Sequence, residues 1–71
     1  MLMASNDAKI RNYEDLLVVR RIVYQELCNL RRNMKGPEHA VSRQMVIERI
    51  CDVLREMQEM QNRIEQLSRE N

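Results

Sequence analysis

A run of apolar side chains at coiled-coil spacing constrains the fold of this 71-residue chain more than any other feature. From Val46 to Leu67 the apolar residues lie alternately four and three apart, the heptad spacing of a helix that packs along a seam against another helix. The a positions are Ile50, Met57 and Ile64, and the d positions are Val46, Val53, Met60 and Leu67. No Gly or Pro interrupts the run. The pattern therefore predicts a helix whose seam contacts a second helix.

A broader apolar stripe occupies the first half of the chain. Its main positions follow helical spacing and are Leu16, Val19, Val23, Leu27, Leu30 and Met34, with Leu17, Ile22, Tyr24 and Cys28 on its flanks. A stripe this wide is typical of a bundle helix that touches two neighbours. We expect a first helix over residues 7–34, preceded by a flexible N-terminus over residues 1–6.

The only Gly and the only Pro of the chain stand together between the two stripes. A Gly just after the last periodic residue predicts a left-handed helix end at Gly36, and Pro37 can open the next helix. The turn is therefore expected at residues 35–37 and the second helix at residues 38–70, in a single domain. Because so short a connection makes its helices antiparallel neighbours, the sequence predicts an all-α, two-helix hairpin.

Folding the chain about this turn brings the two stripes level with one another. The expected neighbours are Val23 and Ile50, Leu16 and Met57, Tyr13 and Met60, and Ile10 and Ile64. Each pair matches one apolar or aromatic side chain with another, so the two stripes, identified separately, support the same antiparallel register.

Composition indicates that the hairpin cannot bury its own apolar surface. Aromatic residues make up 3% of the chain, with no Phe or Trp, and scaffolds of this size rely on disulfides, metals or association. We expect a homodimer, an antiparallel four-helix bundle that serves as a scaffold or assembly domain. In a second interpretation, a helix from another protein fills the groove of the hairpin. The residues expected in the core or interface are Leu16, Val19, Val23, Leu27, Leu30, Val46, Ile47, Ile50, Val53, Leu54, Met57, Met60, Ile64 and Leu67.

Basic side chains on the first helix support a third interpretation. Residues 1–37 carry seven basic and four acidic side chains, whereas the remaining residues carry five and seven. The basic residues at issue are Arg20, Arg21, Arg31, Arg32 and Lys35, and eleven-residue spacing stacks the two Arg pairs on the same faces. Such a stripe on a dimeric hairpin could contact the phosphates of a nucleic acid. The alternative is a solvated face, or ion pairs with acids such as Glu26, Glu48 and Asp52.

Several classes of function are not expected. No nucleophile arrangement or phosphate-binding loop is present, so we predict no enzymatic activity and no cofactor. His39 has no second His or Cys beside it, which argues against a metal site, and no small-molecule ligand is expected. The longest apolar run, Leu16 to Val19, is too short for a membrane span. The first five residues do not resemble a secretory signal, and Cys28 and Cys51 are expected to be buried reduced thiols, so we expect an intracellular protein of the cytoplasm or nucleus.

Overall fold

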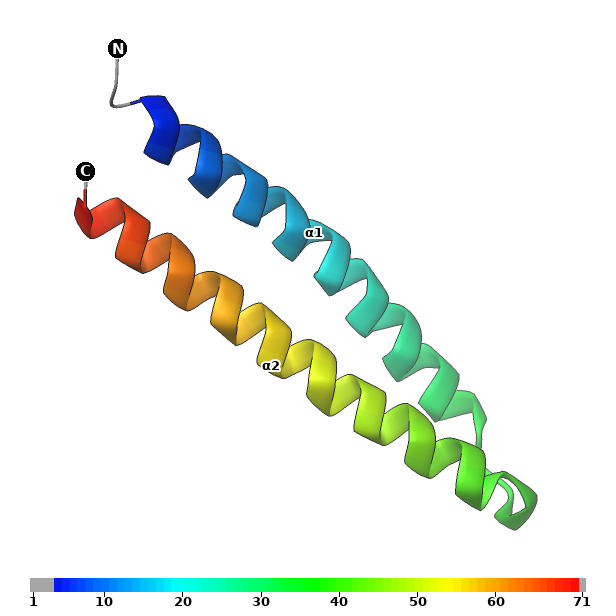
Figure 1. Ribbon diagram of the computed structural model, residues 1–71. Coiled ribbons are helices and arrows are strands. Elements are labelled where there is room, and N and C mark those ends of the chain that lie inside the picture. Colours follow the sequence, from blue (N-terminus) through cyan, green and yellow to red (C-terminus); the bar gives the residue numbers. More distant parts are fainter. Residues whose placement is uncertain (1–3, 71) are drawn as a thin grey trace.

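Two long antiparallel helices joined by a short turn make up the protein in a computed structural model that describes residues 4–70 (Figure 1). Helix α1 spans Ala4–Asn33, a short 3₁₀ helix η1 spans Pro37–His39, and helix α2 spans Ala40–Glu70. The hairpin measures 58 × 15 × 11 Å and is a single layer of two helices. The all-α hairpin predicted from the two stripes is therefore confirmed.

The helix ends differ slightly from those expected. Helix α1 begins at Ala4, so residues 4–6 belong to the helix, while residues 1–3 lie outside the described residues. Helix α2 begins at Ala40, because the residues from Pro37 to His39 form a tighter 3₁₀ turn before the α-helix starts. Proline suits the first turn of a helix, because a backbone N–H at that position would have no partner within the helix and proline has none.

The turn does not use a left-handed glycine. Gly36 has φ −82° and ψ 159°, an extended conformation, and it caps η1 instead of ending α1. The predicted left-handed helix end is therefore wrong. The residue before a proline is forced by steric contact with the proline ring into extended conformations, so Pro37 dictates the backbone of Gly36. Helix α1 ends earlier, where Met34 N–H donates to the carbonyl of Arg31 at 3.0 Å.

A side chain from α2 closes the open end of α1. Nη1 of Arg43 donates to the carbonyl oxygen of Met34 at 2.8 Å and lies 3.4 Å from that of Gly36. The last carbonyls of a helix have no partners within the helix and carry its negative dipole end, so a guanidinium is a favourable partner for them. Arg43 therefore ties the first turn of α2 to the end of α1.

The core is a narrow seam between the helices. Within residues 6–70, the buried hydrophobic side chains are Leu17, Ile50, Val53 and Leu67. The three from α2 belong to the predicted heptad run. In α1, however, Leu17 is 6% exposed, whereas Leu16, expected on the main stripe, is 36% exposed. The seam of α1 is therefore rotated away from the main stripe, and it includes the half-buried residues Ile10, Tyr13, Arg20, Tyr24 and Leu27.

Candidate interaction surfaces

The hairpin has two long sides, one on each side of the seam. On one side, Leu16 lines a pocket with Arg63, and Arg63 lines an adjoining pocket with Glu56. On the other side, Leu17 and Arg21 line two adjoining pockets that share no residue with the first two. We call the first side face A and the second side face B.

Face A is defined by helical spacing from these residues. Positions three, four or seven apart lie on the same side of a helix, so the side that carries Leu16 continues along α1, and the side that carries Glu56 continues along α2. Face A comprises Leu16, Val19, Val23 and Leu30 of α1 with Met45, Arg49, Glu56 and Arg63 of α2. Its α1 half thus contains four of the six residues of the main apolar stripe predicted from the sequence, whereas Leu27 of that stripe lies in the seam.

Much of this stripe is open to solvent. Val19 is 49% exposed, Leu30 is 45% exposed and Met45 is 64% exposed. Arg20 pairs with Glu56 across the hairpin, so Leu30, ten residues further along α1, lies level with residue 46, ten residues earlier in α2. The exposed apolar side chains of Leu30 and Met45 therefore lie at a similar level near the loop end of the hairpin.

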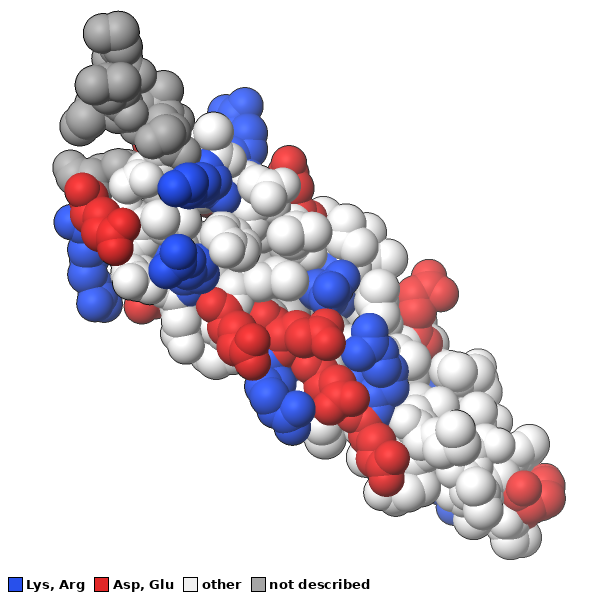
Figure 2. All heavy atoms as spheres, in the orientation of Figure 1, with Lys and Arg blue, Asp and Glu red and all other residues white. Residues whose placement is uncertain are grey.

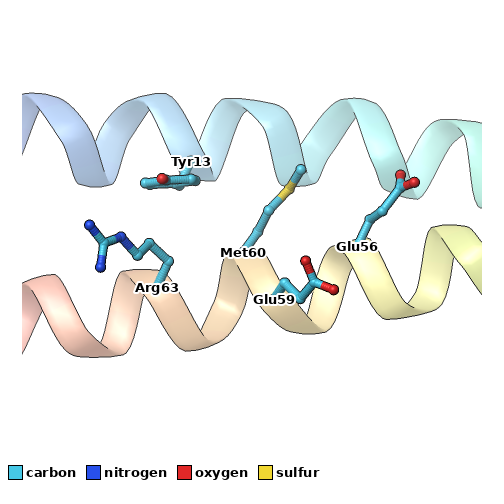
Figure 3. Close-up of a pocket in the computed structure, with 5 residues that line it drawn as sticks. All are labelled: Tyr13, Glu56, Glu59, Met60 and Arg63. Atoms are coloured by element: carbon cyan, nitrogen blue, oxygen red, sulfur yellow. The ribbon is translucent and has the colours of Figure 1, made fainter.

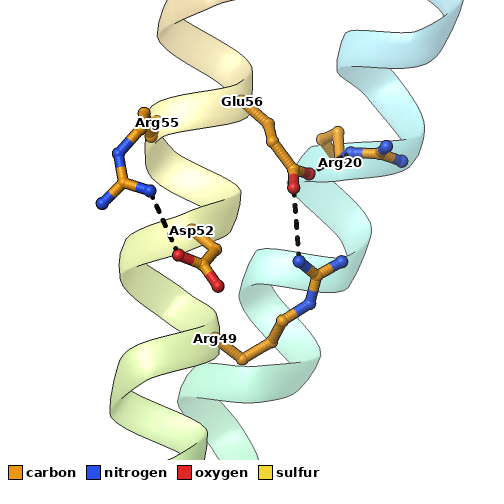
Figure 4. Close-up of polar contacts among 5 residues, drawn as sticks. All are labelled: Arg20, Arg49, Asp52, Arg55 and Glu56. Atoms are coloured by element: carbon orange, nitrogen blue, oxygen red, sulfur yellow. Dashed lines mark hydrogen bonds and ion pairs between the residues drawn. The ribbon is translucent and has the colours of Figure 1, made fainter.

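Several of the charged groups near face A are paired with one another (Figure 4). Glu56 accepts a hydrogen bond from Nε of Arg20 at 2.8 Å and another from Nη1 of Arg49 at 3.3 Å. Asp52 accepts one from Arg55 at 3.2 Å. Partial burial acts to raise the pKa of Glu56, but the hydrogen bonds and charges of Arg20 and Arg49 outweigh it and hold the pKa below its ordinary value. Glu56 is therefore ionised and doubly bonded at neutral pH.

An aromatic side chain fills the seam beside this network. Tyr13 of α1 and Met60 of α2 line one pocket, and both lie between the helices (Figure 3). Glu56, Glu59 and Arg63 form the rest of the lining. Tyr13 and Met60 are thus neighbours, as the antiparallel register predicted. Met57, expected near Leu16, instead lines a pocket with Leu17.

Face B has an apolar groove with a cation at its centre. Its two pockets share Leu17, Arg21 and Gln61. Val18, 52% exposed, lines one pocket, and Leu54, 45% exposed, lines the other. The remaining lining residues are Glu14, Met57, Gln58 and Ile64. Face B comprises all these residues together with Ile47, which lies seven residues before Leu54 on the same side of α2.

The residues predicted for the core or interface thus fall into three groups. Those buried or half-buried in the seam are Leu27, Val46, Ile50, Val53, Met57, Met60, Ile64 and Leu67. Those on face A are Leu16, Val19, Val23 and Leu30, and those on face B are Ile47 and Leu54. One flat interface with a second hairpin could therefore cover the group on face A or the group on face B but not both.

The basic residues do not form one continuous stripe. Arg20 is bound to Glu56, whereas Arg21, the next residue, lies in the groove of face B. Arg31 and Arg32 line a separate pocket with Cys28 near the loop, and Lys35 is exposed in the turn. Over the part of the surface seen in Figure 2, acidic side chains gather along the middle of α2, and the loop end carries few charges.

The two cysteines differ in exposure, and one of them affects the pKa of a nearby tyrosine. Cys28 is half-buried, but Cys51 is exposed, so the expectation of two buried thiols is wrong for Cys51, and neither forms a disulfide. The pKa of Tyr24 is raised by a hydrogen bond with the side chain of Cys28. The charge of Cys28 and the partial burial of Tyr24 raise this pKa further. Tyr24 and Cys28 are four residues apart, one helical turn, which places them in reach of each other.

Neither a metal site nor a membrane span is found among the residues that the structure describes. In that part of the chain, no group of three or more His, Cys, Asp or Glu side chains could hold a metal ion. Neither α1 nor α2 is long and apolar enough to cross a membrane.

Sequence reasoning missed two of the polar contacts that position these surfaces. The cap from Arg43 depends on where the chain turns, and the Arg20–Glu56 pair depends on the register of the hairpin.

A comparison of the chain with known protein families, with curated proteins and with solved structures finds no match.

Proposed function

We propose that the chain is a non-enzymatic association module, in which face A of one hairpin packs on face A of a second copy to form an antiparallel four-helix bundle. The observation that carries this proposal is the exposed apolar stripe of face A. In an isologous dimer each stripe covers the same stripe of its partner, so one surface satisfies both copies. The bundle would act as a scaffold or assembly domain.

The surface area of the hairpin supports this proposal. The chain exposes 5593 Å². A compact monomer of 8.6 kDa exposes only about 4,700 Å². The excess of about 900 Å² is close to the roughly 800 Å² that each partner buries in a standard protein–protein interface. A second hairpin can cover this surplus, whereas two helices in a single layer cannot.

The charges of face A also suit an identical partner. Because Glu56 is already paired with Arg20 and Arg49, a copy of the same face brings no unpaired carboxylate of Glu56 into the interface. Paired charges can be covered at much lower cost than isolated ones. For the same reason, Arg20 is not free to bind a phosphate, which weakens the nucleic-acid interpretation.

Two leucine variants with equal starting exposure test the choice of face. Leu30 on face A and Leu54 on face B are each 45% exposed. Sedimentation equilibrium at micromolar concentration should give twice the chain mass for the unmodified protein and for Leu54→Glu, and the single chain mass for Leu30→Glu. Circular dichroism then shows whether each variant remains helical.

The alternative outcomes are distinct. A helical, monomeric unmodified chain would refute the association module. A monomeric Leu54→Glu variant beside a dimeric Leu30→Glu variant would place the interface on face B and refute the assignment to face A.

A further inference from the structure

Face B places a cation without a partner inside an apolar groove. Arg21 lies where the two pockets of this face adjoin, between the exposed side chains of Val18 and Leu54. Within residues 6–70, Arg21 forms no hydrogen bond and no ion pair. Glu14 lines one end of the groove but makes no ion pair with Arg21. The groove therefore offers both apolar surface and an unused guanidinium.

This isolation distinguishes Arg21 from most arginines of the hairpin. Every arginine of α2 has a partner. Arg43 donates to Met34, Arg49 to Glu56, Arg55 to Asp52 and Arg63 to Gln66, and Arg69 forms an ion pair with Glu65. The neighbouring Arg20 also has its partner in Glu56. Arg21 is thus the arginine that lines the interhelical groove while its five donors remain available.

We propose that face B binds an acidic amphipathic helix of another protein, whose apolar side packs between Val18 and Leu54 and whose carboxylate pairs with Arg21. An amphipathic helix laid in an apolar groove is a recurrent mode of recognition. A guanidinium gives a carboxylate two parallel hydrogen bonds, which are stronger than neutral ones. Gln61, which also lines the groove, adds an amide donor and acceptor for polar side chains of the guest helix, whereas the amide nitrogen of Gln58 already donates to Asn62.

Charge complementarity separates this occupant from the others. A phosphate backbone gains nothing from Val18 and Leu54, and strong nucleic-acid binding requires several phosphate contacts rather than a single cation. A second copy cannot offer Arg21 a free carboxylate from Glu56, because two arginines already bind that carboxylate. The acidic helix is the occupant that uses both the apolar walls and Arg21. The inference does not depend on face A, because the two faces lie on opposite sides of the seam.

A pair of synthetic peptides tests the proposal with the full chain. The probe is a fluorescein-labelled amphipathic helix with leucine at a and d positions and glutamate at e and g positions; the control peptide has glutamine in place of every glutamate. In fluorescence anisotropy at low salt, the glutamate peptide should bind about tenfold more tightly than the glutamine peptide. Arg21→Glu should remove that difference, and a peptide with lysine in place of glutamate should then bind better.

Matched variants identify the surface. Arg11→Glu changes the net charge equally but lies outside the groove, so it should keep the preference for the glutamate peptide. Leu54→Glu should abolish binding, whereas Leu30→Glu, on face A, should retain it. Sedimentation equilibrium of Arg21→Glu should give the same mass as the unmodified chain. Failure of the proposed helix binding at face B can then be distinguished from failure of the proposed dimer.

Three results would overturn the proposal. The first is equal binding of the two peptides by the unmodified chain. The second is a preference for the glutamate peptide over the glutamine peptide that survives in Arg21→Glu. The third is duplex RNA that binds with the same dependence on Arg21 and displaces the peptide, which would assign face B to nucleic acid.

Discussion

Arg20 and Glu56 join the two helices through a hydrogen-bonded ion pair, with 2.8 Å between Nε and Oε1. The residues are 36 apart in sequence, so this contact exists only in one antiparallel register. It also places a charged residue in the seam of α1, in line with Tyr13, Leu17 and Tyr24. The pair therefore helps to fix which side of α1 faces α2 and which side remains exposed.

The stability of the hairpin should fall in acid because of Glu56. Partial burial raises the pKa of Glu56, but Arg20 and Arg49 hold this pKa below its ordinary value. A carboxylate whose pKa is lower in the folded state stabilises the fold above its unfolded value of about 4.3, and this contribution is lost as pH falls through the folded-state pKa. Urea unfolding at pH 6 and pH 3 should show a larger loss for the unmodified chain than for Glu56→Gln. Equal losses would mean that the pair does not contribute.

Two adjacent leucines should differ in their contribution to stability. Leu17 is 6% exposed and Leu16 is 36% exposed, so Leu17→Ala should cost about 2 kcal/mol or more of unfolding free energy, and Leu16→Ala about 1 kcal/mol or less when measured in dilute solution. Because Leu16 lies on face A, its cost should grow with protein concentration. Chemical denaturation at two concentrations measures both effects. A larger cost for Leu16→Ala in dilute solution would contradict the observed seam.

The seam of α2 was predictable from the sequence, whereas the seam of α1 was not. Heptad spacing identified the seam of α2, because apolar residues fill it from Val46 to Leu67. In α1 the most regular apolar stripe lies on face A instead, since the seam of α1 contains Arg20 and two tyrosines, which a search for aliphatic periodicity passes over. The charge of Arg20 is tolerated there because Glu56 is opposite, and that fact belongs to the register rather than to either helix alone.

The position of the turn was predictable from the sequence, but its conformation was not. Gly and Pro marked its position correctly, but the conformation of Gly36 follows from the ring of Pro37 rather than from a helix end. The cap from Arg43 could not be anticipated, because its acceptors come within reach only once the chain has turned. The division of exposed residues between the two faces likewise required the hairpin to be closed first.

Replacement of Gly36 by alanine should be tolerated. Its φ of −82° is accessible to any residue, so Gly36→Ala should stabilise the chain by about 0.4–1 kcal/mol by restricting the unfolded state. A new Cβ would overlap the carboxylate of Glu38, the mobile end of a flexible side chain, which must swing away. The double variant Gly36→Ala/Glu38→Ala removes this overlap and serves as the control. Destabilisation of both variants in thermal unfolding would indicate a left-handed glycine after all.

Removal of the Arg43 cap should loosen the end of α1. Arg43→Met keeps much of the aliphatic stem but loses the hydrogen bond to Met34 O, which should cost about 1 kcal/mol. Amide hydrogen exchange should accelerate in the last turn of α1 and in η1. Arg55→Met, which breaks an exposed pair with Asp52 within α2, should change stability by less than about 0.5 kcal/mol. Equal effects of the two variants would argue against a cap.

The most direct test of the central claim is the mass of the unmodified chain in solution as its concentration is varied. The proposed bundle predicts a sedimentation mass that approaches twice the chain mass of 8.6 kDa at micromolar concentration, with thermal stability that rises with concentration because dimerisation is linked to folding. A fully helical species that keeps the single chain mass and one melting temperature over the whole range would contradict the account.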